Sequence, residues 1–210
     1  MLDCQNLTYQ LNRQSIIKNF SFSLNQGKHI LIKGASGSGK TTLLCLLAGL
    51  IKASSGKIIY DKQEITTLTA AKLDKFRAKS LGFVFQNFHL IKYLTIKQNL
   101  ALVGTMSGVK ILDDEIQQYL TELGLAEKAN ELVDTLSIGQ IQRLAVIRSV
   151  ISKANWILCD EPTSALDDDN TNKLCSFLKI QAAKNNSSLI IVSHDNRVEK
   201  YFQNIQILTL

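Results

Sequence analysis

Residues 34–41 read GASGSGKT and fit the phosphate-loop pattern: a glycine, four residues, then glycine, lysine and serine or threonine. A strand-like segment at 28–34 precedes the motif and a helix-like segment at 40–51 follows it, as the pattern requires. Glycines let backbone N–H groups close around phosphate oxygens, and the N-terminus of the following helix favours negative charge. The motif therefore predicts an α/β fold that binds the phosphates of a nucleotide.

Two side chains of this loop have the chemistry that a nucleoside triphosphate needs. Lys40 brings a cation to the outer phosphates, and the Thr41 hydroxyl is placed to ligate Mg2+. A glycine-rich turn arising by chance is the competing interpretation, and the flanking strand and helix argue against it. The residues expected to bind the nucleotide here are Gly34, Ala35, Ser36, Gly37, Ser38, Gly39, Lys40, Thr41 and Thr42.

Strand-like and helix-like segments alternate along the rest of the chain. Apolar or alternating patterns predict strands at 15–24, 28–34, 56–61, 81–86, 155–161, 187–195 and 204–210. Helical periodicity dominates 95–151, most clearly in DDEIQQYLTELGL. This alternation favours a mostly parallel sheet.

The helical block lies between two strand-rich parts, which indicates an insertion into an α/β core. We expect a single domain over 1–210 that carries this helical block as an insertion.

Composition is that of an ordinary globular protein, with 45% hydrophobic and 20% charged residues. The formal net charge of +6 is modest and the basic residues are dispersed, which favours a solvated surface over a nucleic-acid interface. The longest apolar run, at 43–51, is too short to span a bilayer, and the N-terminus lacks the pattern of a signal peptide. The four cysteines form no C-x-x-C pair, so we expect reduced thiols in a reducing compartment.

Two carboxylates follow the apolar strand within ILCDEP at 157–162. Asp160 at the strand end suits a magnesium ligand, directly or through water. Glu161 would project toward the γ-phosphate, where a carboxylate can orient and deprotonate water. Two acids after a strand are more often a solvated loop. With a phosphate loop in the same chain, and because the carboxyl ends of parallel strands meet at one edge, we favour the catalytic interpretation.

Two more polar residues end predicted strands. His194 ends IVSHD, and we expect it to reach the γ-phosphate from the same edge of the sheet. Gln86 ends GFVFQ and could bridge metal or water. A lone histidine is more often structural, and His29 and His89 are interpreted in that way because they lack this context.

In order, the segments GASGSGKT, FVFQ, LSIGQIQR, ILCDEPTSALD and IVSHD resemble the motifs of the ATP-binding cassette ATPases, the nucleotide-binding subunits of ABC transporters. The resemblance covers nearly the whole chain. It implies a P-loop NTPase core that hydrolyses ATP with Mg2+ and dimerises around two ATP molecules. It also implies a core at about 1–86 and 156–210 and a helical subdomain at about 87–155. The subdomain is expected to contact a transmembrane permease, at the cytoplasmic face of the membrane.

The resemblance also implies roles for single residues. Tyr9 is similar to the aromatic residue that stacks on adenine, and Gln86 to the glutamine that senses both metal and the transmembrane subunit. Residues 164–167, SALD, are similar to the loop that joins the two active sites of a dimer. His194 is similar to the switch histidine of the family.

The segment LSIGQ at 136–140 stands where the family usually has L-S-G-G-Q. The resemblance implies that Ser137, Gly139 and Gln140 complete the ATP site of the other protomer from a helix N-terminus. Ile138 replaces the first glycine, which keeps a backbone N–H but disfavours positive φ. Either this position needs no positive φ, or the site is weakened. We favour the first, because the other signature residues and Glu161 remain.

The segments GFVFQNFHLIKYLTIKQNL and SALDDDN resemble the lipoprotein-releasing, macrolide-exporting and cell-division ATPases. They predict an export or lipoprotein-release type, with a polar amino-acid uptake ATPase as the alternative. A soluble cassette protein acting on nucleic acid or ribosomes is a third interpretation. One phosphate loop and no sustained heptads argue against it. We expect a homodimer with a permease partner and no nucleic-acid partner.

Overall fold

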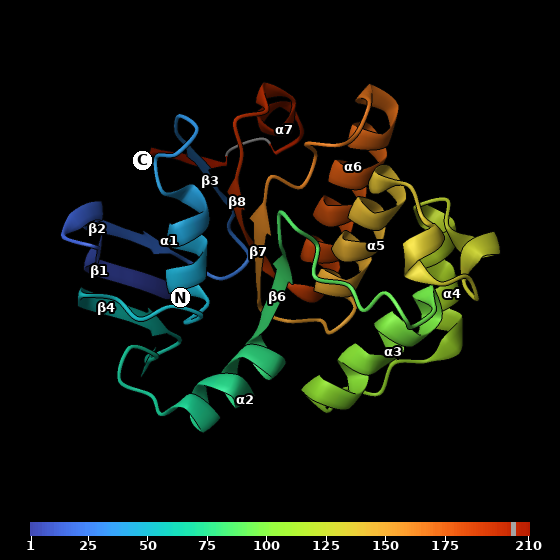
Figure 1. Ribbon diagram of the computed structural model, residues 1–210, viewed down its shortest axis with the longest axis horizontal. Helices are drawn as coiled ribbons and strands as arrows, with labels where there is room; N and C mark the ends of the chain where they lie inside the picture. Colours follow the sequence, from blue (N-terminus) through green and yellow to red (C-terminus); the bar gives the residue numbers. More distant parts are fainter. Residues whose placement is uncertain (203–204) are drawn as a thin grey trace.

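The computed structural model describes residues 1–202 and 205–210, and within these residues the strands form two sheets. One is antiparallel, in the order β2-β1-β4-β5, and the other is parallel, in the order β6-β7-β8-β3-β9 (Figure 1). The strands are β1 (Leu2–Leu11), β2 (Gln14–Leu24), β3 (Ile30–Lys33), β4 (Ser55–Tyr60), β5 (Gln63–Glu64), β6 (Leu81–Val84), β7 (Trp156–Asp160), β8 (Ser188–Val192) and β9 (Gln206–Thr209).

The helices lie between these strands in the chain, as an α/β fold requires. They are α1 (Lys40–Leu47), α2 (Ala70–Ser80), α3 (Ile96–Ser107), α4 (Asp113–Glu122), α5 (Ile138–Val150), α6 (Asp168–Asn185) and α7 (Asn196–Tyr201). Two 3-10 turns, η1 (Ala126–Lys128) and η2 (Val133–Thr135), connect α4 to α5. None of the helices within the described residues is long and apolar enough to cross a bilayer.

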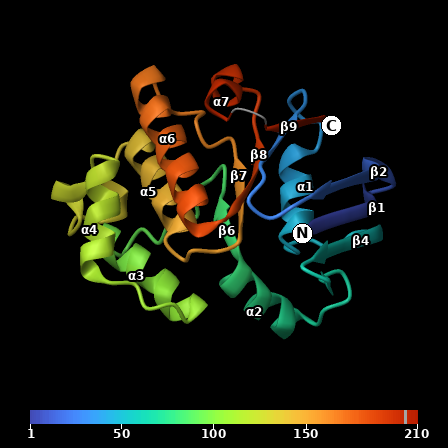
Figure 2. The same ribbon diagram turned by 180° about the vertical axis from the view of Figure 1, so that it is seen from behind.

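Strands β7 and β8 are buried along their whole length, because helices cover both faces of the parallel sheet. Ile157 and Cys159 of β7 belong to one core cluster, with residues of α5 and α6. Trp156 and Leu158 point the other way, into a second cluster with residues of α1 and the antiparallel sheet. Figures 1 and 2 both show α1 on one side of β7 and β8, with α5 and α6 on the other.

Helix α5 packs directly on strand β6. A Cβ atom placed on Gly82 would lie 1.9 Å from the carbonyl oxygen of Ser149, so only glycine fits this approach. On the buried side of α5, Leu144 and Ile147 are fully buried. Helix α5 begins within the signature segment LSIGQ at 136–140, so this packing fixes the signature against the parallel sheet.

The segments predicted as strands at 15–24, 28–34, 56–61, 81–86, 155–161 and 187–195 correspond to β2, β3, β4, β6, β7 and β8. The strand predicted at 204–210 begins at Asn204, which lies outside the described residues, and β9 covers Gln206–Thr209. The helix predicted at 40–51 ends earlier, at Leu47. The helical stretch predicted at 95–151 holds α3, α4 and α5.

Candidate active site

Four neighbouring parallel strands bring the predicted polar residues to one edge. In the order β6, β7, β8 and β3, every adjacent pair is parallel, so their carboxyl ends lie at the same edge of the sheet. Gln86 follows β6, and His194 follows β8. Asp160 is the last residue of β7 and Glu161 comes directly after it, while the phosphate loop at 34–41 follows β3. Gln86 is exposed at this edge.

The phosphate loop folds back on its own lysine. The buried Lys40 Nζ donates to the carbonyl oxygens of Gly34, at 2.8 Å, and Ala35, at 2.9 Å. Gly39, which precedes α1, has φ +98°, and a Cβ there would lie 2.9 Å from Ile16 Cγ2. Glycine at this position therefore lets α1 begin against β2 with its N-terminus at the loop.

Asp160 ends β7 as a buried carboxylate, and among the described residues its Oδ1 has no hydrogen-bond partner. Burial raises its pKa and the neighbouring Glu161 raises it further, while Thr41 and Lys40 act in the opposite direction. A buried oxygen left in this state favours a cation as its missing partner.

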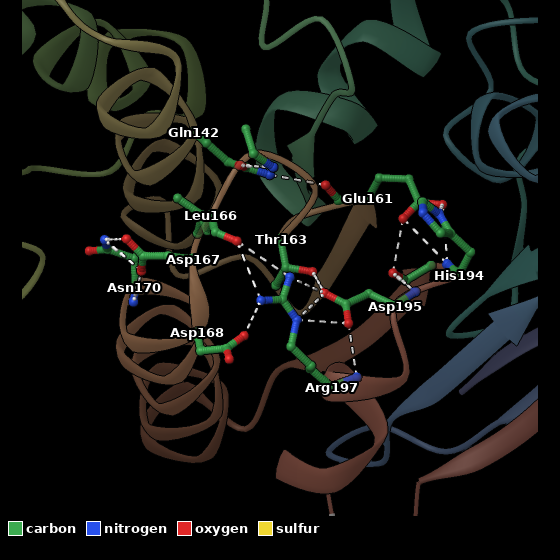
Figure 3. Close-up of polar contacts among 12 residues, drawn as sticks. Gln142, Glu161, Thr163, Leu166, Asp167, Asp168, Asn170, His194, Asp195 and Arg197 are labelled. Atoms are coloured by element: carbon green, nitrogen blue, oxygen red, sulfur yellow. Dashed lines mark hydrogen bonds and ion pairs between the residues drawn. The ribbon is translucent and has the colours of Figure 1, made fainter.

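Glu161 is held in a left-handed backbone conformation, with φ +49°. Its carboxylate accepts hydrogen bonds from Ser193 Oγ at 2.9 Å and from the His194 backbone N–H at 3.2 Å (Figure 3). The ring Nδ1 of His194 lies 2.8 Å from Glu161 Oε1. The two residues predicted from separate strand ends therefore touch. The Glu161 residue is 8% exposed, whereas the His194 side chain is 72% exposed.

A second group of polar residues joins the loop after β7 to the loop after β8. Asp195 accepts from Thr163 Oγ1 at 2.7 Å and from Arg197, which also bonds Asp168 and the Leu166 carbonyl (Figure 3). Partial burial alone would raise the pKa of Asp195, but the hydrogen bonds from Arg197 and Thr163 outweigh it and lower the pKa to about 2. These contacts hold the loop after β7, which includes residues 164–167, against the loop after β8, which carries His194.

Sequence reasoning missed Gln142, Thr163 and Arg197. Gln142 lies inside α5, where it donates from Nε2 to the Glu161 carbonyl at 3.0 Å and accepts from the Ala165 N–H at 3.0 Å. Gln142 does not end a strand, so the reasoning that identified Glu161 and His194 does not apply to it. Its place in QIQR, beside the signature, was the feature of the sequence that could have indicated it.

The signature segment forms the start of α5. Ser137 is the N-cap, and its hydroxyl accepts from the Gln140 N–H while the Gln140 side chain accepts from the Ser137 N–H. Ile138 is the first residue of the helix and is 64% exposed. The helical backbone at Ile138 supports the interpretation that this position needs no positive φ, since an isoleucine adopts helical φ without strain. Gly139 packs on the SALD loop, close to the Ala165 carbonyl.

The structure does not bring all predicted nucleotide residues together in one chain. The helix that carries Ser137 and Gly139 packs on one face of the parallel sheet, and α1 with the phosphate loop packs on the other. Tyr9, by contrast, lies near the phosphate loop. It pairs in β1 with Ile17, whose side chain lies against Gly39.

A groove of about 500 Å³ lies between α2, α3 and the loop after β6. Its walls are mainly apolar, with Arg77, Arg148 and His89 as basic groups and Asp74 as the acidic one. Arg148 of α5 donates to the carbonyl oxygens of Phe88 and His89, each at 2.5 Å. These two hydrogen bonds connect the loop that follows Gln86 to α5.

Comparison with known proteins gives consistent matches. The profile described as "ABC transporter" matches residues 17–164. The putative hemin import ATP-binding protein HrtA of Staphylococcus haemolyticus is 37% identical over 188 residues, which cover 89% of this chain and 85% of that protein. The bacitracin export ATP-binding protein BceA of Halalkalibacterium halodurans is 36% identical over 194 residues, which cover 91% and 77%.

Solved structures match the entire chain. A dimeric post-hydrolysis state of the ATP-binding cassette MJ0796 with ADP and Pi aligns with a TM-score of 0.88 and 31% identity, covering 100% of this chain and 94% of that one. A second dimeric structure of the MJ0796 cassette aligns with a TM-score of 0.87. The fold class predicted from sequence, an α/β P-loop core with a largely parallel sheet and added helices, is confirmed.

Proposed function

Because this chain belongs to the ABC transporter family and is one of its ATP-binding cassette ATPases, we propose that two copies bind two ATP molecules between them and drive a separate membrane permease. The observation that carries the proposal is the contact between Glu161 and His194 at strand ends beside the phosphate loop.

The nucleotide lies against the loop at 34–42 in this proposal, with Tyr9 stacked on the adenine. Lys40 exchanges its bonds with the loop carbonyls for bonds to the outer phosphates. Thr41, Asp160 and Gln86 hold Mg2+, and the unpartnered Oδ1 of Asp160 supports this placement.

Hydrolysis in this proposal is base-catalysed by Glu161. Its carboxylate accepts a proton from the attacking water, whose oxygen bonds to the γ-phosphorus. The bond from that phosphorus to the bridging oxygen breaks, and ADP and inorganic phosphate leave. His194, with an exposed ring that touches Glu161, is placed to contact the γ-phosphate.

A second copy of the chain supplies the rest of each site. The exposed Ser137 and Ile138, with Gly139 and Gln140, start a helix that packs away from the chain's own phosphate loop. A helix N-terminus favours anions, so the partner's γ-phosphate suits this position. The dimeric MJ0796 structures support this arrangement, and we propose a homodimer.

The permease binds in the groove between α2, α3 and the loop after β6, and residues at about 87–155 act as the helical subdomain that contacts it. The walls are mainly apolar, Arg77 pairs with Asp74, and Arg148 has no carboxylate partner among the described residues. This lining fits a cytoplasmic permease segment that is apolar and carries an acidic side chain. With this contact, the ATPase would lie at the cytoplasmic face of the membrane. We favour export as the direction of transport. The relative named for bacitracin export supports this choice, whereas the name of the hemin relative gives the import direction.

The test is the variant Glu161→Gln, which keeps the shape of the side chain and removes the base. It should bind ATP while turnover falls by about 10²–10⁴-fold. The ATP-bound dimer should accumulate and be visible by light scattering. Hydrolysis at the wild-type rate would show that Glu161 is not the base, and His194 would then be the next candidate.

The permease contact has its own test in membrane fractions of the native cell. Met106 lines the groove and is 67% exposed, so Met106→Asp places an unfavourable charge there without disturbing the core. We expect the protein to leave the membrane fraction while ATP turnover of the purified variant is unchanged. Membrane association equal to wild type would argue against this docking surface.

A further inference from the structure

Gln142 uses both ends of its amide on the loop that carries the proposed base. It lies in α5 five residues after Ser137 and is 1% exposed. Its Nε2 donates to the Glu161 carbonyl at 3.0 Å (Figure 3). Its Oε1 accepts from the Ala165 N–H, also at 3.0 Å. One buried side chain therefore connects the signature helix to two positions of the segment 161–165.

Glu161 needs such support because its backbone is left-handed, with φ +49°. A glutamate adopts this conformation only where its surroundings over-determine it. Here the Glu161 N–H donates to the Val192 carbonyl at 3.0 Å. The Glu161 carbonyl accepts from Gln142 at 3.0 Å and from the Ser164 N–H at 3.3 Å. Gln142 gives the shorter of the two bonds to that carbonyl, and it alone comes from outside the loop.

We propose that Gln142 is a positioning residue for hydrolysis: it holds Glu161 in the left-handed conformation that aims the carboxylate, and it ties this conformation to the signature helix. The inference rests on the proposed role of Glu161 as the base. Because the signature at Ser137 serves the partner's ATP in that proposal, the same side chain links the base of one site to the phosphate contact of the other. If α5 shifted when Ser137 contacts the partner's nucleotide, the side-chain amide of Gln142 would transmit that movement to Glu161.

Two substitutions separate positioning from simple core packing. Gln142→Met keeps the length of the side chain and removes both hydrogen bonds. We expect kcat to fall by about 10- to 100-fold, since small displacements of a reacting group cost rate on this scale, while the KM for ATP changes by less than about twofold. The matched control is Gln181→Met in α6, because Gln181 is also a buried helical glutamine, at 2% exposure. If both variants had the same kcat, the proposal would be wrong.

Gln142→Glu gives a pH readout that packing alone does not produce. The ionised carboxylate accepts from the Ala165 N–H but cannot donate to Glu161. The protonated carboxyl donates through its O–H and reproduces the pattern of the amide. Burial raises the pKa of the introduced group, so the ratio of variant kcat to wild-type kcat should rise as pH falls from 8 to 6. A flat ratio, equal to that of Gln142→Met, would contradict the positioning role.

A crystal structure of Gln142→Met tests the geometry without reference to catalysis. We expect Glu161 to leave the left-handed region and its carboxylate to leave Ser193. Retention of φ near +49° would overturn the proposal even if Glu161 is the base. The opposite case is also clear. If Glu161 left the left-handed region in Gln142→Met while Glu161→Gln remained fully active, Gln142 would still be shown to support the Glu161 backbone. Only the assignment of Glu161 as the base would be refuted. The two failures are thus distinguishable.

Discussion

At the scale of single residues, the site combines features that a stable core avoids. Glu161 has a left-handed backbone, and one oxygen of the buried Asp160 lacks a hydrogen-bond partner within the described part of the chain. A left-handed non-glycine residue costs about 1–3 kcal/mol, and an unpaired buried polar group has a similar cost. Both features lie at the end of β7, where we propose that the metal ion and the attacking water bind.

Lys40→Ala tests the phosphate loop. Within the described residues, the ammonium group bonds only to the carbonyls of Gly34 and Ala35, so we expect folding to survive. We expect ATP affinity to fall by about 10- to 100-fold, since hydrogen bonds to charged groups contribute about 1.5–3 kcal/mol. A titration with fluorescent ATP measures it. The exposed Lys52→Ala is the control. Equal affinities in both variants would refute the assignment.

His29 should make stability depend on pH. Its Nδ1 accepts the Leu189 N–H at 3.2 Å, which requires a neutral ring, and burial lowers the pKa of His29 below its usual 6.5. The unfolded chain therefore binds the proton more readily, so the free energy of unfolding should decrease as pH falls below 6.5. Urea unfolding between pH 7.5 and 5 measures this loss.

The comparison for this effect is His29→Gln, which keeps an acceptor and removes the titrating group. This variant should lose less stability than wild type over the same pH range. Parallel curves for the two proteins would exclude His29 as the source.

The residue types of the site could be predicted from sequence, but their contacts could not. Asp160, Glu161 and His194 were identifiable because polar residues that end buried strands meet at one edge of a parallel sheet. The left-handed conformation of Glu161 leaves no mark in the sequence. Nor does the bond from Gln142, which depends on how α5 packs on the sheet.

At the scale of elements, α5 joins the three surfaces for which we propose a function. Its N-terminus carries the signature, its middle holds the Glu161 loop through Gln142, and its last turn holds the groove loop through Arg148. Phe88 and His89 both have positive φ, and the Arg148 guanidinium donates to both of their carbonyls. Movement of this helix would therefore reach the nucleotide and the groove together.

Arg148→Met should loosen the groove loop. Burial lowers the pKa of Arg148 to about 10, and within the described residues the guanidinium has no carboxylate partner. We expect the free energy of unfolding to fall by about 1–3 kcal/mol, with faster hydrogen exchange at 87–91 and unchanged ATP affinity. Denaturant titration and exchange mass spectrometry measure these effects against Lys110→Met, an exposed site. Unchanged exchange at 87–91 would argue against a holding role for Arg148.

Most elements were predictable from hydrophobic pattern, and the exceptions have physical causes. No element was predicted for β1, because its burial does not alternate. Asn6 has φ +48°, and the pairing of β1 with β2 shifts register between Cys4 and Leu7, which breaks the period of two. Helix α6, also outside the predicted elements, opens with a polar run from Asp168 and shows its apolar face only from Leu174 onward.

At the scale of the whole molecule, the parallel sheet separates two halves of a site. The phosphate loop begins the helix on one face, and the signature begins the helix on the other. In the proposed dimer, two copies facing each other would bring each phosphate loop to the partner's signature, so that the helix N-terminus at Ser137 would face the partner's nucleotide.

Mixing two inactive variants tests this shared arrangement. Lys40→Ala damages the phosphate loop, and Ser137→Arg damages the signature and its cap. Each homodimer then has two broken sites. A heterodimer of the two collects both defects in one site and leaves the other site intact. We therefore expect ATP turnover to reappear on mixing and to rise with total protein concentration, as measured by phosphate release.

The controls for this experiment are differential tags, which show that heterodimers form, and thermal melting, which shows that both variants fold despite a cap loss of about 1 kcal/mol. If the signature served its own chain's nucleotide, every protomer would carry a defect and mixing would restore nothing. Strict coupling of the two sites would also give no recovery. A covalently linked pair with one mutated site separates these cases, because independent sites keep about half of the activity and strictly coupled sites keep none.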